Sequence, residues 1–304
     1  MKICVTGASG KAGQAVVAEL VAHGYQVHAT DLARPALDSP ADGYEVMFTQ
    51  ADLTDYGQAA EVLAGMDAVV HLANIPAPDL RTPAVTFNEN ITMNYNVFSA
   101  AAVTAGLTRV VWASSETTLG LPFDTPPRYA PVDEDHYPLP TTSYALSKVA
   151  SETIAGQIAG WSGKPFVALR FSNISGPRSF HKGSVVAHFF KQVLAGERPV
   201  VYGDGSQTRD YIYVGDVVAA ALAAAASDVV GPINIGTGRE TSVIELVDAL
   251  RELGGREDFE AELAPARPGE VQRVTLDASR AERELGWRAE TGLDDGLRLT
   301  LDSL

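Results

Sequence analysis

The sequence predicts an α/β fold: a doubly wound parallel sheet of the Rossmann type with a smaller, interleaved C-terminal lobe. Three observations lead to this prediction. Short apolar segments typical of buried strands alternate with amphipathic segments of helical periodicity through the N-terminal half. A glycine-rich turn joins the first strand-like segment to the first helix-like segment. Farther along, loops rich in Gly, Pro and Ser replace this alternation and indicate a second lobe of different construction.

The expected elements follow one another in the order of βαβ units. Strands are expected at residues 2–6, 26–30, 46–49, 68–72, 109–113 and 166–170. Helices are expected at residues 12–23, 56–64, 90–105 and 144–161. Because right-handed crossovers connect parallel strands, these helices should cover both faces of the sheet. The Ala-rich stretch at residues 217–226 is too short to span a membrane and is interpreted as a packed helix.

The change in pattern after Arg170 sets the expected domain boundaries. Strand-like segments become shorter there, and loops rich in Gly, Pro and Ser occur at residues 175–178 and 203–206. No long linker and no internal repeat is visible, so the two parts should be interleaved rather than arranged in series. We expect one domain built from residues 1–172 and about 211–238, and a second lobe built from residues 173–210 and 239–304.

Composition and charge argue against several classes of partner. Lys and Arg number 23 against 38 Asp and Glu, which gives a net charge of −15 and disfavours nucleic acid or an anionic membrane as the main partner. No run of ~20 apolar residues is present, so no membrane span is expected. The one cysteine, Cys4, lies in an apolar run and cannot form an internal disulfide, which fits a core residue of a cytoplasmic protein. No group of His, Cys, Asp and Glu has metal-ligand spacing, so no metal is expected.

A candidate dinucleotide site lies in the turn after the first strand. Gly7, Gly10 and Gly13 allow a tight turn, close approach of a pyrophosphate and close packing of the helix on the strand. Lys11 and Ala12 lie between them, where the N-terminus of the helix would face the phosphates. The motif alone is a weak signal, since an ordinary strand-to-helix turn can also use glycines for steric reasons.

Asp31 strengthens this interpretation and favours NAD as the cofactor. It ends the second strand, where a carboxylate accepts hydrogen bonds from the ribose on the adenine side of a dinucleotide. The same charge repels the 2′-phosphate of NADP, although Arg34 is close enough to leave NADP open.

Further cofactor contacts are expected where the third and fourth strands end, because the carboxyl ends of parallel strands line the ligand crevice. Asp52 and Leu53 follow the third strand, and Leu72 and Ala73 close the fourth. Asp52 would either bind the adenine amino group or act as a helix N-cap. His71 is interpreted more readily as a packed or backbone-bonded imidazole than as a chemical group.

Tyr144 and Lys148 form the candidate catalytic pair. Their spacing places a phenol and an ammonium on one face of the expected helix. A free phenol has a pKa of about 10, and a neighbouring ammonium together with an oxidised nicotinamide would lower it toward neutrality. Ser114 and Ser115 follow the fifth strand, where a hydroxyl can hold the reacting oxygen, although a serine pair is also common in turns. Because Tyr-x-x-x-Lys is frequent in helices, the motif indicates a catalytic pair only in combination with the dinucleotide site that precedes it.

Taken together, these motifs resemble the extended short-chain dehydrogenase/reductase family, in particular its NAD-dependent nucleotide-sugar epimerases and dehydratases. The resemblance extends from Met1 to about Leu299 and includes three later segments. These segments are Arg170-Phe171-Ser172-Asn173, Gly203-Asp204-Gly205-Ser206-Gln207-Thr208-Arg209-Asp210-Tyr211 and Arg267-Pro268-Gly269-Glu270.

The resemblance implies a role for each matching residue. Ser115 would be the catalytic hydroxyl, Tyr144 the base and Lys148 its partner, which would also bind the nicotinamide ribose. Asn90, at the start of the expected helix, would contact the cofactor. The residues that would bind the substrate are Ser115, Glu116, Asn173, Arg209 and Arg267, the two arginines through its diphosphate. A surface salt bridge is the alternative for each arginine.

The family includes several activities, and the residues favour epimerisation. Glu116-Thr117 stands where the dehydratases carry an Asp-Glu pair, so the second acid needed to eliminate water is missing. The leading hypothesis is therefore epimerisation at C4 of a UDP-hexose through a transient 4-keto sugar. Thr118-Leu119-Gly120 and Ser143-Tyr144-Ala145 depart from the usual family pattern and keep open an NAD-dependent dehydrogenase or reductase of a sugar, uronate or other small alcohol. A catalytically silent NAD-binding protein is the third hypothesis, although such relatives usually lack the tyrosine or the lysine.

The resemblance also implies a homodimer. Members of the family often pair through two helices that form a four-helix bundle, and residues 90–105 and 144–161 are the candidates here. Neither the sugar nor the nucleotide base is indicated by the sequence.

Overall fold

The computed structural model describes residues 1–34, 46–77, 80–119, 129–177, 185–256, 260–266 and 271–303. Its centre is a seven-stranded sheet with the order β11-β6-β5-β4-β1-β2-β3, in which all neighbouring strands are parallel. The strands are β1 (Lys2–Thr6), β2 (Gln26–Asp31), β3 (Met47–Gln50), β4 (Ala68–His71), β5 (Arg109–Ser115), β6 (Phe166–Phe171) and β11 (Gly231–Ile235). The doubly wound fold predicted from the sequence is confirmed.

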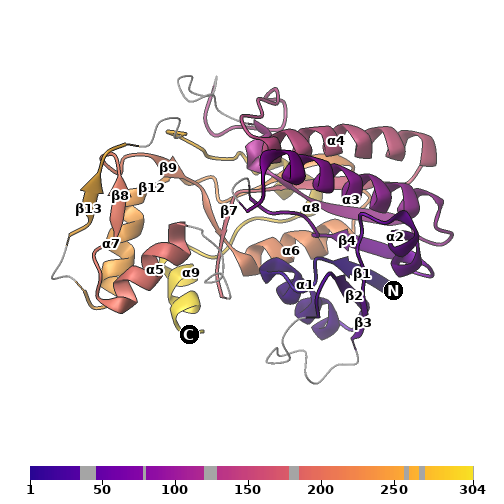
Figure 1. The fold of residues 1–304 in the computed structure, drawn as a ribbon, viewed down its shortest axis with the longest axis horizontal. Coiled ribbons are helices and arrows are strands. Elements are labelled where there is room, and N and C mark those ends of the chain that lie inside the picture. Colours follow the sequence, from indigo (N-terminus) through magenta and orange to yellow (C-terminus); the bar gives the residue numbers. More distant parts are fainter. Residues whose placement is uncertain are drawn as a thin grey trace.

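Helices cover both faces of this sheet (Figure 1). One face carries α2 (Tyr56–Leu63), α3 (Pro83–Val103) and α4 (Ser143–Ser162). The other face carries α1 (Lys11–Ala22), α6 (Val214–Ala225) and α8 (Ser279–Leu285). The Ala-rich stretch of the sequence belongs to α6, so its interpretation as a packed helix is confirmed.

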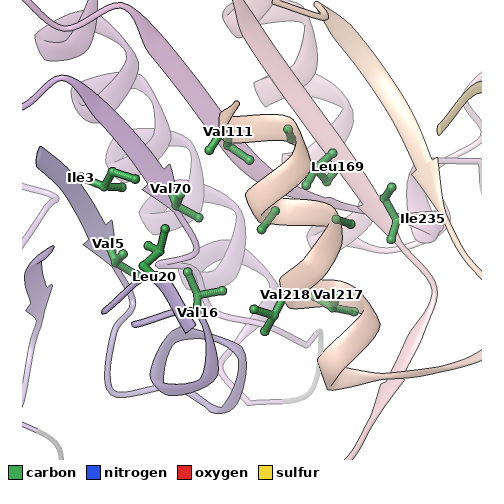
Figure 2. Close-up of a cluster of buried hydrophobic side chains, with 14 of the residues drawn as sticks. Ile3, Val5, Val16, Leu20, Val70, Val111, Leu169, Val217, Val218 and Ile235 are labelled. Atoms are coloured by element: carbon green, nitrogen blue, oxygen red, sulfur yellow. The ribbon is translucent and has the colours of Figure 1, made fainter. Parts of the chain in front are cut away.

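Each face has its own hydrophobic core, because successive side chains of a strand point to opposite sides of a sheet. Cys4 of β1 packs with α2 and α3, whereas its neighbours Ile3 and Val5 pack with α1 and α6. Figure 2 shows the core that contains Ile3 and Val5, in which Leu20 of α1 and Val218 of α6 lie against the strands. Burial of such side chains stabilises the fold by about 1.5–3 kcal/mol each. Burial also raises the pKa of the Cys4 thiol to about 12, which confirms its expected place in the core.

Two differences from the expected elements have physical reasons. Helix α3 begins at Pro83 instead of residue 90, because a proline in the first turn favours a helix start there. Asn90 therefore lies inside the helix, and the expectation that it opens the helix is wrong. Strand β11 has no counterpart among the expected strands, since Gly231 and Pro232 at its start are typical of a loop.

A smaller lobe lies beside the sheet and is drawn at the left of Figure 1. Its elements are α5 (Val185–Ala195), β8 (Val200–Tyr202), β9 (Thr208–Arg209), β12 (Thr241–Ser242), α7 (Val243–Leu253), β13 (Glu262–Ala264) and α9 (Leu293–Leu301). A separate core that includes Phe189, Leu246 and Leu297 holds α5, α7 and α9 together. Strands β7 (Asn173–Ser175) and β10 (Tyr211–Tyr213) pair in parallel where the chain passes between the sheet and this lobe.

The ligand crevice expected for an open parallel sheet would lie outside the ends of β1 and β4. These two strands are neighbours, and the order of strands along the chain reverses between them. Ligands bind at such a reversal in open parallel sheets, outside the carboxyl ends of the strands. Thr6 and His71 are paired at this edge, and His71 is paired in turn with Trp112 of β5.

Candidate active site

The glycine-rich turn between β1 and α1 forms a cradle that no side chain fills. Gly7 has φ +68°, a left-handed conformation that favours glycine. A Cβ at Gly7 would lie 2.6 Å from the backbone nitrogen of Ala73, and a Cβ at Gly13 would lie 2.1 Å from the carbonyl oxygen of Gly7. Gly10 caps α1 without a side-chain hydrogen bond, and a helix N-terminus attracts anions. The cradle therefore fits the pyrophosphate of a dinucleotide.

Replacing Gly13 by alanine should destroy this cradle. The new methyl group would overlap a backbone carbonyl, so we expect the affinity for NAD to fall at least about tenfold. Isothermal titration calorimetry measures the loss. Gly156 of α4 provides the matched control, because a Cβ there meets nothing within 4 Å and Gly156→Ala should leave the affinity unchanged. An equal loss in both variants would contradict the prediction.

Asp31 lies at the end of β2, next to the glycine-rich turn. Its Oδ2 accepts a hydrogen bond from the N–H of Ser9 (2.9 Å), and its Oδ1 accepts one from the N–H of Leu32 (2.7 Å). The guanidinium of Arg34 lies over the ring of Phe48, 5.7 Å from its centroid, as in a cation–π contact. A carboxylate beside the turn, with the nearby arginine stacked on β3, fits the unmodified ribose of NAD.

Asp52 and Leu53, after β3, differ in what they offer a ligand. Oδ1 of Asp52 accepts hydrogen bonds from the N–H (2.9 Å) and hydroxyl (2.7 Å) of Thr54. Asp55 is the N-cap of α2, so the N-cap alternative for Asp52 is wrong. Asp52 is exposed and can reach a ligand, whereas the side chain of Leu53 is buried in the core, so that only its backbone can do so.

Leu72 and Ala73 continue from β4 along the edge of the glycine-rich turn. The N–H of Leu72 donates to the carbonyl oxygen of Thr6, and the N–H of Ala73 donates to the hydroxyl of Thr6, both at 3.2 Å. His71 is fully buried between Thr6 (2.6 Å) and Asn94 (2.9 Å). Burial lowers the pKa of His71 to about 3, so its imidazole is neutral and serves packing, as the sequence favoured.

Asn90 is buried and uses its amide within the protein. Its Oδ1 accepts from the N–H of Ile75 (2.8 Å), and its Nδ2 donates to the carbonyl of Ile75 (3.2 Å) and the hydroxyl of Ser147 (3.3 Å). The side chain thus ties the segment after β4 to α4, both of which border the crevice.

Ser115, Tyr144 and Lys148 come together where β5 ends and α4 begins. Ser115 lies close enough to Tyr144 for hydrogen bonding by its hydroxyl to lower the pKa of the phenol. Oγ of Ser115 accepts from the N–H (3.3 Å) and hydroxyl (3.1 Å) of Thr117, so its own proton can be donated to another oxygen. Nζ of Lys148 donates to the carbonyl of Ala113 (2.6 Å) and lies 5.5 Å from the centroid of the Tyr144 ring. The three groups predicted to be catalytic are therefore neighbours.

Burial controls the ionisation of both Tyr144 and Lys148. It raises the pKa of Tyr144 to about 12, although the hydrogen bond from Ser115 acts against this. It lowers the pKa of Lys148 to about 7, although the charge of Glu152 acts against this. In the chain alone Lys148 is not among the causes that shift the pKa of Tyr144, and the buried lysine itself holds its proton weakly. The lowering expected from Lys148 together with an oxidised nicotinamide therefore stays a prediction. Additional positive charge next to the phenol is needed before it ionises.

Sequence reasoning missed Glu152, which joins α4 to β5 and β6. Its carboxylate accepts two hydrogen bonds from Arg170, between Nε and Oε1 (3.0 Å) and between Nη2 and Oε2 (2.7 Å). The hydroxyl of Ser114 donates a third to Oε1 (2.5 Å). The i, i+4 spacing of Lys148 and Glu152 on one helix is the signal that could have indicated it.

On the substrate side the structure brings Glu116 and Asn173 together. Nδ2 of Asn173 donates to Oε1 of Glu116 at 2.5 Å. Burial and the charge of Asp210 raise the pKa of Glu116 to about 8, while Arg209 and Asn173 act in the opposite direction. Both predicted contacts of the sugar therefore lie at one place, next to Ser115.

The structure describes only one of the two arginines that are predicted to bind the diphosphate. Nη1 of Arg209 donates to the carbonyl oxygens of Thr208 (2.8 Å) and Val271 (2.7 Å), which fixes the guanidinium at the edge of the smaller lobe. Arg267 lies outside the described residues. In the described part of the chain, no three His, Cys, Asp or Glu side chains are grouped to hold a metal ion, and no helix is long and apolar enough to cross a membrane.

The fold and the site define an enzyme of the extended short-chain dehydrogenase/reductase type with NAD as its cofactor. The glycine cradle and Asp31 would hold the pyrophosphate and ribose, and the Ser115–Tyr144–Lys148 cluster lies at the same edge of the sheet. The chain belongs to the NAD dependent epimerase/dehydratase family, whose model matches residues 3–236.

Individual relatives match over almost their whole length. The UDP-glucose 4-epimerase of Mycolicibacterium smegmatis is 34% identical over 99% of this chain and 98% of its own. The structure of UDP-glucose 4-epimerase with UDP-glucose from Thermotoga maritima has a TM-score of 0.90 and 30% identity, and covers 100% of this chain and 98% of that one. The UDP-glucose 4-epimerase of Thermus thermophilus, solved with NAD, has a TM-score of 0.87 and 31% identity, with coverage of 100% and 98%. The family resemblance seen in the motifs is confirmed.

Proposed function

We propose that this protein is a nucleotide-sugar epimerase that acts at C4 of a UDP-hexose. The observation that carries the proposal is the cluster of Ser115, Tyr144 and Lys148 at the same edge of the sheet as the glycine cradle. Relatives named UDP-glucose 4-epimerase, similar over the whole chain, support the choice of reaction. A phenol, a hydroxyl and an ammonium at one point are suited to moving a single proton to and from a sugar oxygen.

Each residue of the cluster has a separate role in the proposed reaction. The glycine cradle and Asp31 would hold NAD, which when bound would supply reversible hydride chemistry at C4 of the sugar. Tyr144 takes the proton of the C4 hydroxyl, and Ser115 holds the same oxygen while charge develops on it. Lys148, when protonated, favours the phenolate through its charge. After the 4-keto sugar has rotated, Tyr144 returns the proton, so that no net oxidation results.

The remaining site residues bind the two ligands. We infer that residues 1–172 and about 211–238 bind NAD, and that residues 173–210 and 239–304 bind most of the nucleotide sugar. Asn173 would contact the sugar. Arg209 and Arg267 would bind the diphosphate, because planar guanidinium groups match phosphate oxygens in pairs. The lone buried thiol of Cys4 favours a cytoplasmic location.

An assay without added cofactor tests the proposal. Purified protein should interconvert UDP-galactose and UDP-glucose, followed by chromatography of the nucleotide sugars, and no NADH should accumulate. NADH that rises in step with substrate consumption would instead identify a dehydrogenase. Absence of turnover on every member of a panel of UDP-, GDP- and dTDP-sugars would refute the epimerase.

We further propose that α3 and α4 pair two copies of the chain. Large apolar side chains are exposed on these helices, which pack side by side: Tyr95 and Val103 on α3, and Leu146 and Trp161 on α4. Trp161→Glu should therefore shift the protein from dimer to monomer in light scattering after size-exclusion chromatography. The control is Leu263→Glu, at an exposed leucine of β13 in the other lobe, which should not change the mass. A monomeric wild type would rule the dimer out.

A further inference from the structure

Glu116 is an acidic side chain that the proposed mechanism leaves without a chemical role. It begins the short helix η2 (Glu116–Leu119) directly after Ser115. Asn173 donates to its Oε1 at 2.5 Å, whereas its Oε2 is buried and has no hydrogen-bond partner in the part of the chain that the structure describes. A buried polar atom without a partner is unfavourable, so this oxygen is suited to meeting a group that arrives with a ligand.

Three ionisable groups surround this carboxyl. Arg209 and Asp210 approach from the smaller lobe, and Tyr144 approaches from α4. Arg209 directs Nη1 at backbone carbonyl oxygens, and its charge offsets the other effects only in part. Burial, reinforced by Asp210, raises the pKa of Glu116 to about 8, so most of these carboxyls hold a proton at pH 7.

A protonated carboxyl can donate one hydrogen bond as well as accept others. Oε1 already accepts from Asn173, so the donor belongs on Oε2, next to the residue that holds the reacting oxygen. We propose that Glu116 is a specificity-determining residue whose Oε2 donates a hydrogen bond to a hydroxyl group of the bound hexose. This inference rests on the proposed function, because it requires a nucleotide sugar in the crevice.

The proposal predicts how sugar binding depends on pH. Loss of the proton above about pH 8 converts the donor into a carboxylate, which can no longer donate a hydrogen bond and whose charge is one of the causes that raise the pKa of Tyr144. The affinity for UDP-glucose should therefore fall as the pH rises from about 7 to about 9, and the affinity for UDP, which has no sugar, should stay constant over that range.

Two variants separate a donor from an acceptor at this position. Glu116→Gln has the same shape as the protonated glutamate, carries an amide N–H that can donate, and has no charge. Its affinity for UDP-glucose should therefore stay within about threefold of wild type at pH 7 and should not decrease at high pH. Glu116→Ala should lose about tenfold in affinity for UDP-glucose and none for UDP. Isothermal titration calorimetry gives these values, and Glu61→Gln, at an exposed glutamate of α2, is the matched control.

The outcomes distinguish this inference from the proposed function. A wild-type protein that neither binds nor converts UDP-sugars refutes the function itself. An active wild type whose UDP-glucose affinity is independent of pH, or a Glu116→Gln variant that binds the sugar as weakly as Glu116→Ala, refutes the inference alone. Wild-type affinity in Glu116→Ala also refutes it, because Glu116 would then not contact the sugar.

Discussion

Replacing Tyr144 by phenylalanine is expected to lower kcat for the interconversion of UDP-galactose and UDP-glucose by about 10²–10⁴-fold, the usual contribution of a general acid–base group. The change removes the phenol oxygen, whose pKa Ser115 lowers, and leaves the ring in its buried place beside Lys148. The melting temperature and the affinity for NAD should therefore stay close to those of the wild type. Turnover and calorimetric titration with NAD are measured on the same preparation.

The matched control for this variant is Tyr56→Phe. It makes the same chemical change at an exposed tyrosine of α2 that has no part in the proposed proton transfer, and kcat should stay unchanged. Normal turnover in Tyr144→Phe would remove Tyr144 from the proton transfer. A variant that binds NAD as tightly as wild type but is inactive supports the assignment, because binding and chemistry are then separated.

The sheet and most of its helices can be predicted because their signals are local. A run such as Ala68 to Val70 is apolar on both faces, which only a strand buried between two helical layers requires. Strand β11 lacks that signal at its Gly231-Pro232 start, and it forms because its last residues complete the buried edge of the sheet against β6. The proline at the start of α3 is visible in the sequence, but a proline considered alone is equally typical of a loop.

In the candidate site, too, some features could be predicted from the sequence and others could not. Ser115 at a strand end, and Tyr144 and Lys148 at helical spacing, are patterns within one element. The pairing of Glu152 with Arg170 joins two elements, and nothing in a single sequence specifies which distant arginine meets a given glutamate. Ionisation was the least predictable property, because it depends on how deeply the tertiary structure buries Lys148.

Replacing Glu152 by alanine is expected to lower the free energy of unfolding by about 3–5 kcal/mol, the cost of breaking a buried ion pair from one side. The side chain of Arg170 is only 4% exposed and that of Glu152 is 12% exposed, so neither charge is well solvated. Without the carboxylate, Arg170 keeps its charge in a buried place and Ser114 loses its acceptor. Unfolding in urea, followed by circular dichroism, measures the loss.

Two comparisons show whether burial is the reason for this loss. Asp248→Asn breaks the ion pair with Arg251 on the surface of α7, where Asp248 is 58% exposed, and should cost only about 0.2–1 kcal/mol. The double variant Glu152→Leu with Arg170→Met removes both buried charges and should be more stable than Glu152→Ala. If the double variant is less stable than Glu152→Ala, the loss of stability in Glu152→Ala comes mainly from the missing ion pair and not from the isolated charge of Arg170.

The same carboxylate should also determine the pH range in which Lys148 works. Burial lowers the pKa of Lys148 to about 7 and Glu152 opposes this, so removing the charge of Glu152 should lower that pKa further. Lys148 then loses its proton at a lower pH, and the basic limb of the kcat/KM profile should move to lower pH in Glu152→Gln, which keeps the shape of the side chain. A variant that is less stable but has the wild-type profile would limit Glu152 to holding α4 on the sheet. A displaced profile would show that the buried pair keeps the catalytic lysine charged.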